Sequence, residues 1–412
     1  MRRRRRSQGQ GENDVSETEP ISATGPSPFP VAVVGADFPG LRLRIEAPEG
    51  TTVRPGQTLF RVRKHPDIAF VSPIAGRVAS ITYAPRRMLG AVIVDPDPAM
   101  PADPVRITPD RSTGAGARQT LLAAGLWPAF VARPFGGMPD PEVRPDAIFV
   151  TATPAAPDAP DPRLVLEGRE AGFIEGLEIL TMLTEGTVHL CQGSGRALVQ
   201  RLPDRVRITS FGSGPGAGLP GTHVHRLHPV GQDRLVWTVG YQDVIAIGHL
   251  FATGLFDPLR TVAISGPGAG APKLVRLPLG VDLQRAARAP DMQGPLRFRT
   301  GAAPFGREAA YLGRHHDTIV IVAQKTPETR NRTSSLRPLF ALAGLESALP
   351  LDILPVPMMR ALRIGDTEAA RRLGCLELLE DDVAALSAHC TSGADYGLHL
   401  RAILDDLRKQ IG

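Results

Sequence analysis

The spacing of apolar residues changes along the 412-residue chain, and this limits the fold more than any other feature. Between residues 31 and 95, short apolar runs such as "TLFRVR" and "AVIVD" alternate with Gly and Pro turns, a pattern typical of a small β-sandwich or barrel. Between 112 and 250, helical stretches alternate with short apolar runs such as "DAIFVTA", which predicts an α/β domain with a mainly parallel sheet. From about 348 the pattern is helical, so the chain is predicted to hold several domains.

Helix signals are clear near the C-terminus. Asp366 is the predicted N-cap for "TEAARRL", with Gly374 as the residue that follows the last helical turn. The last helix carries one apolar stripe, formed by Leu400, Ile403, Leu404, Leu407 and Ile411.

Charge and composition exclude a nucleic-acid binder. The formal net charge is only +5, and beyond residue 28 there are 42 basic against 38 acidic side chains. No segment after the N-terminal "RRRRR" concentrates five or six like charges, as an electrostatic footprint for DNA or RNA would. Residues 1–28 are polar and rich in Gly, Pro and Ser, so we predict a disordered tail.

Three cysteines are too few and too widely spaced for a disulfide framework, which favours a reducing, cytoplasmic setting. No run of 18 apolar residues occurs, and "MRRRRR" is not followed by the apolar core of a secretory signal. The chain is therefore expected to reach a membrane only through a partner. Cys191, at the end of an apolar run, is expected to be an inert buried thiol.

Residues 29–110 resemble biotinyl/lipoyl-type β barrel-sandwich domains. The resemblance rests on a "G-x-x-V-x-x-G-Q-x-L" half followed by a "P-x-x-G-x-V" half, made here by Gly50, Val53, Gly56, Gln57, Leu59, Pro73, Gly76 and Val78. In such domains a lysine between the halves carries the prosthetic group. The only lysine here, Lys64, lacks the flanking methionines, so we expect the fold without a covalently bound cofactor.

The segment "RTVAISGPGAGAPKLVRLPLGVDLQRAARA" resembles the β-grasp modules called soluble-ligand-binding. The predicted fold is thus a multidomain α/β (α+β) chain. Its predicted parts are a tail at 1–28, a β barrel-sandwich at 29–110, a Rossmann-like α/β domain at 111–255, a β-grasp module at 256–345 and a C-terminal helical domain at 346–412.

Three histidines fall within six residues in "GTHVHRLHPVG", a density that suggests a metal site. On a strand, His223 and His225 would point the same way, which suits metal ligation and equally suits two imidazoles on one sheet face. One hypothesis is therefore a zinc-dependent hydrolase with His223, His225 and His228 as ligands and Asp243 as base. Another is a non-enzymatic scaffold that binds a soluble ligand through its β-grasp module.

Another histidine pair, His315 and His316, could orient Asp317, and a turn entering a strand explains it equally well.

From about Val31 to its end, the chain resembles the A subunit of the sodium-translocating NADH:quinone oxidoreductase of bacterial membranes. The blocks that carry this resemblance are "AGLWPAFVARPF" (124–135), "GLPGTHVHRLHPVG" (218–231), "VWTVGYQDVIAIGHLFATG" (236–254), "YLGRHH" (311–316), "LPLDILP" (349–355) and "IGDTEAARRLGCLEL" (364–378). In this family the "GTHxH" pair recurs, whereas the position of His228 is commonly not histidine. The resemblance therefore favours His223 and His225 as polar lining of a cavity or of an interface between subunits, in a loop that enters a strand.

The domain order also resembles the flavoprotein subunit of respiratory complex I and the C subunit of the Rnf complex. Those relatives hold a flavin phosphate on a Gly-rich loop, where backbone N–H groups can approach the anion. Here "GLWPAFVARPFGG" places bulky residues and prolines in that loop, so we predict no FMN or NADH site. Cys375 and Cys390, fifteen residues apart, cannot replace the closely spaced cysteines that hold iron–sulfur clusters in the relatives.

The resemblance implies a peripheral subunit on the cytoplasmic face of the inner membrane, docked chiefly on the membrane-embedded B subunit of a six-subunit complex. That complex couples NADH oxidation and ubiquinone reduction to ubiquinol with Na+ export from the cytoplasm to the periplasm. NADH, FAD, FMN, riboflavin and iron–sulfur centres are expected on other subunits, and this chain is expected to support assembly and quinone reduction. A quinone site needs apolar walls and a few orienting polar groups. Candidate quinone-facing or interface residues are Trp127, Phe130, Arg133, Phe135, Phe211, His223, His225 and Tyr241.

The sequence departs from the family in its added N-terminal tail and near 325–348. That region looks shorter than usual and lacks the family's aromatic-rich block.

Overall fold

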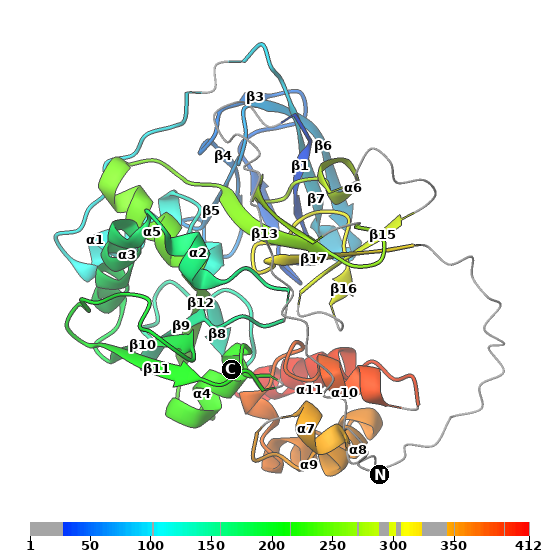
Figure 1. Ribbon diagram of the computed structural model, residues 1–412. Helices are drawn as coiled ribbons and strands as arrows, with labels where there is room; N and C mark the ends of the chain where they lie inside the picture. The colour runs from blue at the N-terminus through cyan, green and yellow to red at the C-terminus, as the bar shows by residue number, and fades with distance from the viewer. Residues whose placement is uncertain are drawn as a thin grey trace, which may run out of the picture.

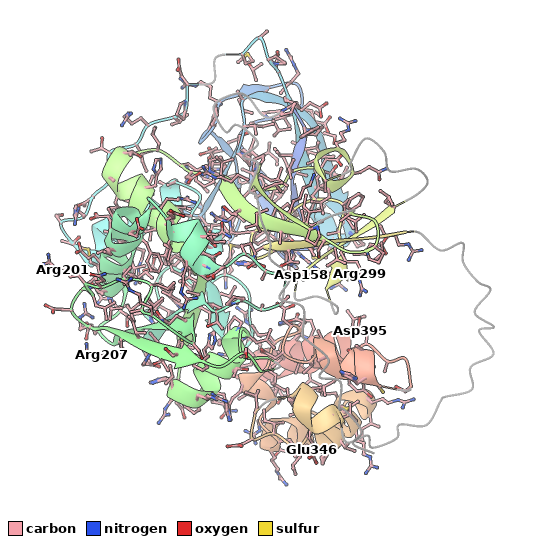
Figure 2. All side chains as sticks on the ribbon, in the orientation of Figure 1. Asp158, Arg201, Arg207, Arg299, Glu346 and Asp395 are labelled. Carbon is pink, nitrogen blue, oxygen red and sulfur yellow. The ribbon has the colours of Figure 1, made fainter. Side chains whose placement is uncertain are left out.

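The computed structural model describes residues 28–100, 103–156, 158–214, 216–269, 272–287, 296–301, 306–323, 344–349, 351–390 and 392–411. Figure 1 shows the N-terminal β domain at the top, the α/β domain at the left, the third sheet to the right of the α/β domain and the C-terminal helices below. Charged side chains such as Arg201, Arg207 and Glu346 are exposed at the periphery (Figure 2). The predicted tail up to residue 27 and most of the 325–348 region lie outside the described residues.

The N-terminal domain is the predicted β barrel-sandwich. One antiparallel sheet has the order β1-β7-β6-β3 and a smaller one the order β2-β4-β5. Val53, Leu59 and Val78, the apolar positions of the two motif halves, are at most 1% exposed. The strands are β1 (Val31–Val34), β2 (Leu43–Ile45), β3 (Thr52–Val53), β4 (Thr58–Val62), β5 (Ala69–Val71), β6 (Gly76–Ala84) and β7 (Met88–Pro96).

The second domain is the predicted α/β domain with a mainly parallel sheet. Its order is β11-β10-β9-β12-β8, and only the edge strand β8 is antiparallel to its neighbour. Ile148 and Val150 of β9 point to the main core, whereas Ala147 and Phe149 point to a smaller cluster beneath α4. The strands are β8 (Val131–Arg133), β9 (Ala147–Ala152), β10 (Thr187–Gly193), β11 (Val206–Phe211) and β12 (Val236–Gly240).

The main-core face of this sheet is covered by tightly packed helices. A Cβ placed on Gly176 would lie 2.1 Å from Val244 O, and one on Gly248 would lie 1.8 Å from Gly172 O. These contacts bring the backbones of two helices together without intervening side chains. The helices of the domain are α1 (Gly114–Ala123), α2 (Pro162–Leu166), α3 (Glu170–Leu183), α4 (Pro220–Leu227) and α5 (Tyr241–Thr253), with a 3-10 turn η2 (Trp127–Ala129).

The third sheet has the order β14-β13-β17-β15-β16, in agreement with the predicted β-grasp module. Its first strand, β13, pairs antiparallel with β14 and parallel with β17. The elements are β13 (Leu259–Ser265), β14 (Lys273–Pro278), α6 (Leu283–Ala286), β15 (Leu296–Thr300), β16 (Arg307–Glu308) and β17 (Thr318–Ala323). His315 and His316 lie at the turn that leads into β17, as expected for a turn entering a strand.

The C-terminal helices enclose an apolar cluster of their own. Asp366 caps α9 by accepting a hydrogen bond from Ala369 N at 2.9 Å, and Gly374 follows that helix with φ of 95°. Both predicted helix signals are confirmed. Four residues of the predicted stripe on α11, Leu400, Ile403, Leu404 and Leu407, are buried. The helices are α7 (Gly344–Ala348), α8 (Pro355–Ile364), α9 (Thr367–Arg372), α10 (Ala384–His389) and α11 (Tyr396–Ile411), with a 3-10 turn η3 (Cys375–Glu377).

Candidate functional site

The histidine-rich segment forms a helix, so the prediction that it enters a strand is wrong. Pro220 occupies the first position of α4, where its fixed φ favours a helix and its missing N–H removes no helical hydrogen bond. His228 ends the helix just before Pro229, which disfavours helical geometry in the residue that precedes it. Because residues two apart on a helix lie on nearly opposite sides, His223 and His225 do not share a face.

His223 points into the protein. It is fully buried, and its ring lies against Phe211, with centroids 4.2 Å apart. Its Nε2 donates to Ala217 O at 2.8 Å, because a carbonyl can only accept, so neutral His223 carries its proton on Nε2. Nδ1 is buried and has no hydrogen-bond partner among the described residues. Burial accordingly lowers the pKa of His223 to about 4, the nearby positive charges of Arg133 and Arg226 adding to that effect.

His225 points toward the C-terminal helices. Its Nδ1 lies 2.7 Å from Glu377 Oε2, and its Nε2 accepts from Asp352 N at 3.3 Å. With Nε2 accepting, the proton lies on Nδ1 and is donated to the carboxylate. His225 and Glu377 are each less than one-fifth exposed, so this contact joins the α/β domain to the C-terminal helices in a shielded place.

The zinc hypothesis requires three histidines around one point, and α4 does not provide this. His223 faces Phe211 and His225 faces Glu377, so their rings diverge. Within the described ranges, no group of three or more His, Cys, Asp or Glu could hold a metal ion. Asp243, the base in that hypothesis, lies in α5 and pairs with Arg260 and Arg314.

Arg133 and Asp382 form a buried ion pair across the same domain contact. Their side chains are 3% and 2% exposed, and Arg133 Nη1 lies 2.9 Å from Asp382 Oδ2. Arg133 also donates to Glu377 O, and Asp382 also accepts from Leu379 N. The start of α4 leaves room for this carboxylate only because residue 221 is glycine: a Cβ there would lie 2.3 Å from Asp382 Oδ1.

Phe135 belongs to this contact as well. It packs against the apolar cluster of the C-terminal helices, and its carbonyl accepts from Arg401 Nη1 at 2.6 Å. Arg401 in turn holds Glu380 through two hydrogen bonds. Arg133, Phe135 and His225 therefore meet the C-terminal helices side by side, and we call these three with Glu377, Glu380, Asp382 and Arg401 the charged domain contact.

The aromatic residues of the loop after α1 lie on the other face of the sheet. Trp127 and Phe130 are fully buried and pack around Trp237 of β12, with ring centroids 5.2 to 5.5 Å apart. Trp127 Nε1 donates to Pro139 O at 2.9 Å, so its polar atom is satisfied inside the protein. Side chains thus fill the interior of this loop.

Tyr241 begins α5 at the carboxyl end of β12. The strand order changes direction between β9 and β12, the position at which open α/β sheets commonly bind ligands. The backbone segments around Gly218 and Pro154 are closely packed beside that position, because a Cβ on Gly218 would lie 2.3 Å from Pro154 O. Burial, with the charge of Asp317 as a smaller cause, raises the pKa of Tyr241 well above its ordinary value. Its hydroxyl is buried without a partner among the described residues.

The eight candidate residues do not converge on one cavity. Arg133, Phe135 and His225 meet at the charged domain contact, and His223 stacks on Phe211 beneath α4. Trp127 and Phe130 lie in the core of the opposite face. Sequence reasoning missed Asp382, Glu377 and Glu380, which are far from their partners along the chain and follow no local motif.

Cys191 is fully buried, and burial raises its pKa, as expected for an inert thiol.

Known proteins align with nearly the whole chain. The model of the NqrA N-terminal barrel-sandwich hybrid domain matches residues 15–97, and that of the NqrA second alpha/beta domain matches residues 113–256. The A subunit of the Na(+)-translocating NADH-quinone reductase of Neisseria meningitidis serogroup C is 33% identical over 430 residues, 95% of this chain and 96% of that protein. The same subunit of Yersinia pseudotuberculosis is 34% identical over 424 residues, 94% of this chain and 95% of that protein.

Among solved structures, an NAD+-reducing NiFe hydrogenase in the H2-reduced state aligns with a TM-score of 0.36 and 13% identity, over 73% of this chain and 62% of that chain. The sequence relatives match at far higher identity and along almost their entire length. The chain belongs to the family formed by the A subunits of Na+-translocating NADH-quinone reductases.

Proposed function

We propose that this chain is the A subunit of a Na+-translocating NADH-quinone reductase and acts as one part of that complex. The observation that carries the proposal is identity of 33% and 34% to two subunits of that name across about 95% of both chains. The complex oxidises NADH, reduces ubiquinone to ubiquinol and exports Na+ from the cytoplasm to the periplasm. Its other subunits are the partners of this chain.

The chain sits peripherally on the cytoplasmic face of the membrane, and the membrane-embedded B subunit is its chief contact. In the part of the chain that the structure describes, no helix is long and apolar enough to cross a membrane.

The chain carries neither flavin nor an iron–sulfur cluster. The loop after α1 supports the absence of flavin. Trp127 and Phe130 fill the interior of this loop, and Pro128 has no N–H to donate to a phosphate. Burial raises the pKa of the Cys375 thiol to about 12, which disfavours the thiolate that an iron ligand requires. NADH, FAD, FMN, riboflavin and the iron–sulfur centres accordingly belong to other subunits.

The contribution of the chain is to assembly and to the quinone-reduction step. The charged domain contact fixes the C-terminal helices on the α/β domain, so the two present one rigid surface to a partner. Among the candidate residues, Arg133, Phe135 and His225 act through this contact, whereas Trp127 and Phe130 support the core. Phe211, His223 and Tyr241 are the remaining candidates for contact with ubiquinone.

Co-purification tests the proposal. A tagged chain expressed from its own locus should be recovered from membranes with the other subunits and should separate from them in chaotrope. The separated chain should contain flavin and iron far below one equivalent. Recovery of the tagged chain alone from the cytosol would overturn the assignment to the complex, and a stoichiometric flavin or iron content would overturn the assignment of the cofactors elsewhere.

A further inference from the structure

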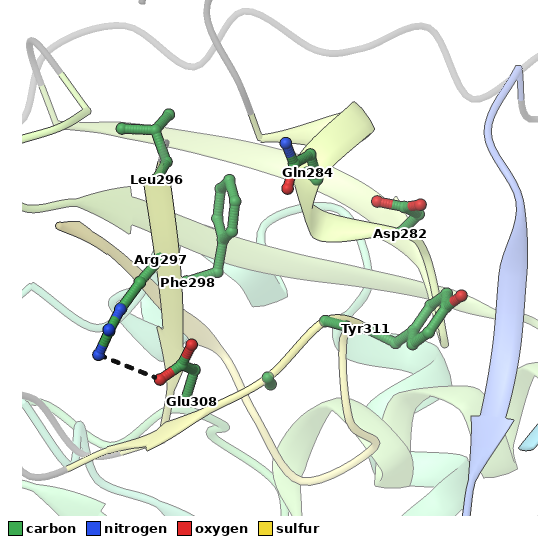
Figure 3. A pocket seen from close by; sticks show the side chains of 9 residues that line it. Asp282, Gln284, Leu296, Arg297, Phe298, Glu308 and Tyr311 are labelled. Atoms are coloured by element: carbon green, nitrogen blue, oxygen red, sulfur yellow. Dashed lines mark ion pairs between the residues drawn. The ribbon is translucent and has the colours of Figure 1, made fainter. Parts of the chain in front are cut away.

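A pocket of about 400 Å³ opens in the β-grasp module. It lies between the start of α6, the strands β15 and β16, and the segment 309–311 (Figure 3). Its volume is within the range of sites that hold small organic molecules. The described residues that line it are Asp282, Gln284, Leu296, Arg297, Phe298, Glu308, Ala309, Ala310 and Tyr311.

One part of the pocket is apolar. Leu296 and Phe298 come from the same strand, and Phe298 is only 4% exposed, so its ring is held in place by the core. Ala309 and Ala310 add small apolar side chains to the lining. A hydrocarbon or aromatic body would lose contact with water on this surface.

The polar groups lie at two separate places in the pocket. Figure 3 shows Arg297 paired with Glu308 on one side, at 3.7 Å, and Asp282 near Tyr311 on the other. An antiparallel bridge joins Asp282 to Tyr311, which fixes both residues relative to the pocket. Gln284 adds an amide beside Asp282.

The Asp282 side of the pocket is negative. Asp282 pairs with Arg285, whose Nε is 3.8 Å from Oδ2 and whose side chain is 62% exposed, so the arginine neutralises the carboxylate only weakly. Burial, and after it the charges of Asp282 and Asp95, raise the pKa of Tyr311, whose hydroxyl therefore stays protonated and neutral. A ligand group with a positive charge and N–H donors suits this place, and an anion does not.

We propose that this pocket binds a small organic cation, with its ammonium group at Asp282 and Tyr311 and its apolar body on Phe298 and Leu296. A carboxylate beside the ammonium group supplies a charge-assisted hydrogen bond, and the apolar wall takes up the body of the ligand. The site lies within one chain, so binding does not depend on assembly of the complex.

Binding of three probes that share a phenyl ring to the full-length chain tests the proposal. Phenethylamine carries the cation, 2-phenylethanol is neutral and phenylacetate is anionic. A fragment of this size should bind with a Kd on the order of 1 mM. We expect phenethylamine to bind at least about tenfold more tightly than the alcohol, since a charge-assisted hydrogen bond is worth roughly that factor, and phenylacetate not to bind measurably. Ligand-detected NMR titration measures all three.

Substitutions locate the site. Asp282→Asn removes the charge and keeps a side chain that can cap α6, so the fold is retained and phenethylamine binding should weaken about tenfold. Tyr311→Phe should weaken it by a smaller factor. Asp366→Asn is the matched control, because Asp366 caps α9 in the same way far from the pocket, and it should leave binding unchanged.

Three outcomes overturn the proposal: no binding of phenethylamine, binding of phenylacetate as tight as that of the amine, or equal affinity in Asp282→Asn and the unmodified chain.

Discussion

Arg133 and Asp382 lie almost entirely out of solvent, 249 positions apart in the sequence. Burying a charge is costly unless it is paired. Here Arg133 and Asp382 pair with each other, and each also makes a hydrogen bond to a backbone group. His225 and Glu377 add a second, slightly more exposed pair beside them. At the residue scale, polar contacts of this kind decide how the C-terminal helices sit on the α/β domain.

Loss of Asp382 should be strongly destabilising. Asp382→Ala leaves Arg133 buried without its counter-charge, which should lower the free energy of unfolding by about 3 to 5 kcal/mol. Both tryptophans of the chain, Trp127 and Trp237, are buried in the α/β domain, so the midpoint of urea unfolding by tryptophan fluorescence reports the effect. Glu368→Ala removes an exposed carboxylate that pairs with Arg371 and Arg372, and should lower the free energy of unfolding far less, because solvent screens exposed ion pairs. An equal decrease in the free energy of unfolding of the two variants would contradict the account.

Acid should destabilise the protein through His223. Its pKa falls from an ordinary 6.5 to about 4 in the fold, so between these pH values the unfolded chain binds more protons than the folded chain. The contribution of neutral His223 to the free energy of unfolding is complete above pH 6.5. It is lost as the pH falls toward 4, by on the order of 3 kcal/mol. His223→Gln should therefore show a shallower fall of the unfolding midpoint across this window than the unmodified chain. His65→Gln, in the turn between β4 and β5, controls for loss of an imidazole elsewhere, and identical slopes in all three proteins would refute the assignment.

At the element scale, glycine positions determine how closely helices approach one another. Helices α3 and α5 meet backbone to backbone at Gly176 and Gly248, and α4 approaches Asp382 at Gly221. A side chain at any of these positions would separate elements that the fold places in contact. The α3–α5 pair in turn covers the sheet face on which Trp127 and Phe130 are buried.

Two glycines on α3 provide a matched test of this packing. Gly176→Ala would place a Cβ 2.1 Å from Val244 O and should lower the free energy of unfolding by about 2 kcal/mol or more. Gly172→Ala would meet only Ile245 O at 3.9 Å, and should be neutral or stabilising by about 0.5 to 1 kcal/mol, because alanine favours a helix. Urea unfolding followed by tryptophan fluorescence compares them; a Gly176→Ala variant as stable as Gly172→Ala would show that the helices do not pack this closely.

Elements whose signals are local can be predicted from the sequence, and those set by distant contacts cannot. The α9 cap at Asp366 and the α11 stripe follow from short spacings and are present. The alternation of histidines around His223 suggests a strand and is misleading. The better signals are Pro220 at the first helical position and Pro229 just beyond the end. No spacing rule pairs Arg133 with Asp382, because only the tertiary fold brings them together.

At the scale of the whole molecule, four structural units form one chain whose identity to its family runs nearly from end to end. The N-terminal barrel-sandwich, the α/β domain and the β-grasp sheet meet around Arg314, which contacts Asp243 and Gly125 and lines a small cavity with residues of the first domain. The C-terminal helices join through the charged domain contact. Such a chain is suited to present a fixed surface to other subunits.

The most direct test of the central claim is the Na+-stimulated NADH:quinone reductase activity of membranes from a strain that lacks this chain. If the chain is the A subunit of the complex, deletion abolishes the Na+-stimulated activity, and expression of the full chain in the deleted strain restores it. Undiminished Na+-stimulated activity in the deleted strain would contradict the account.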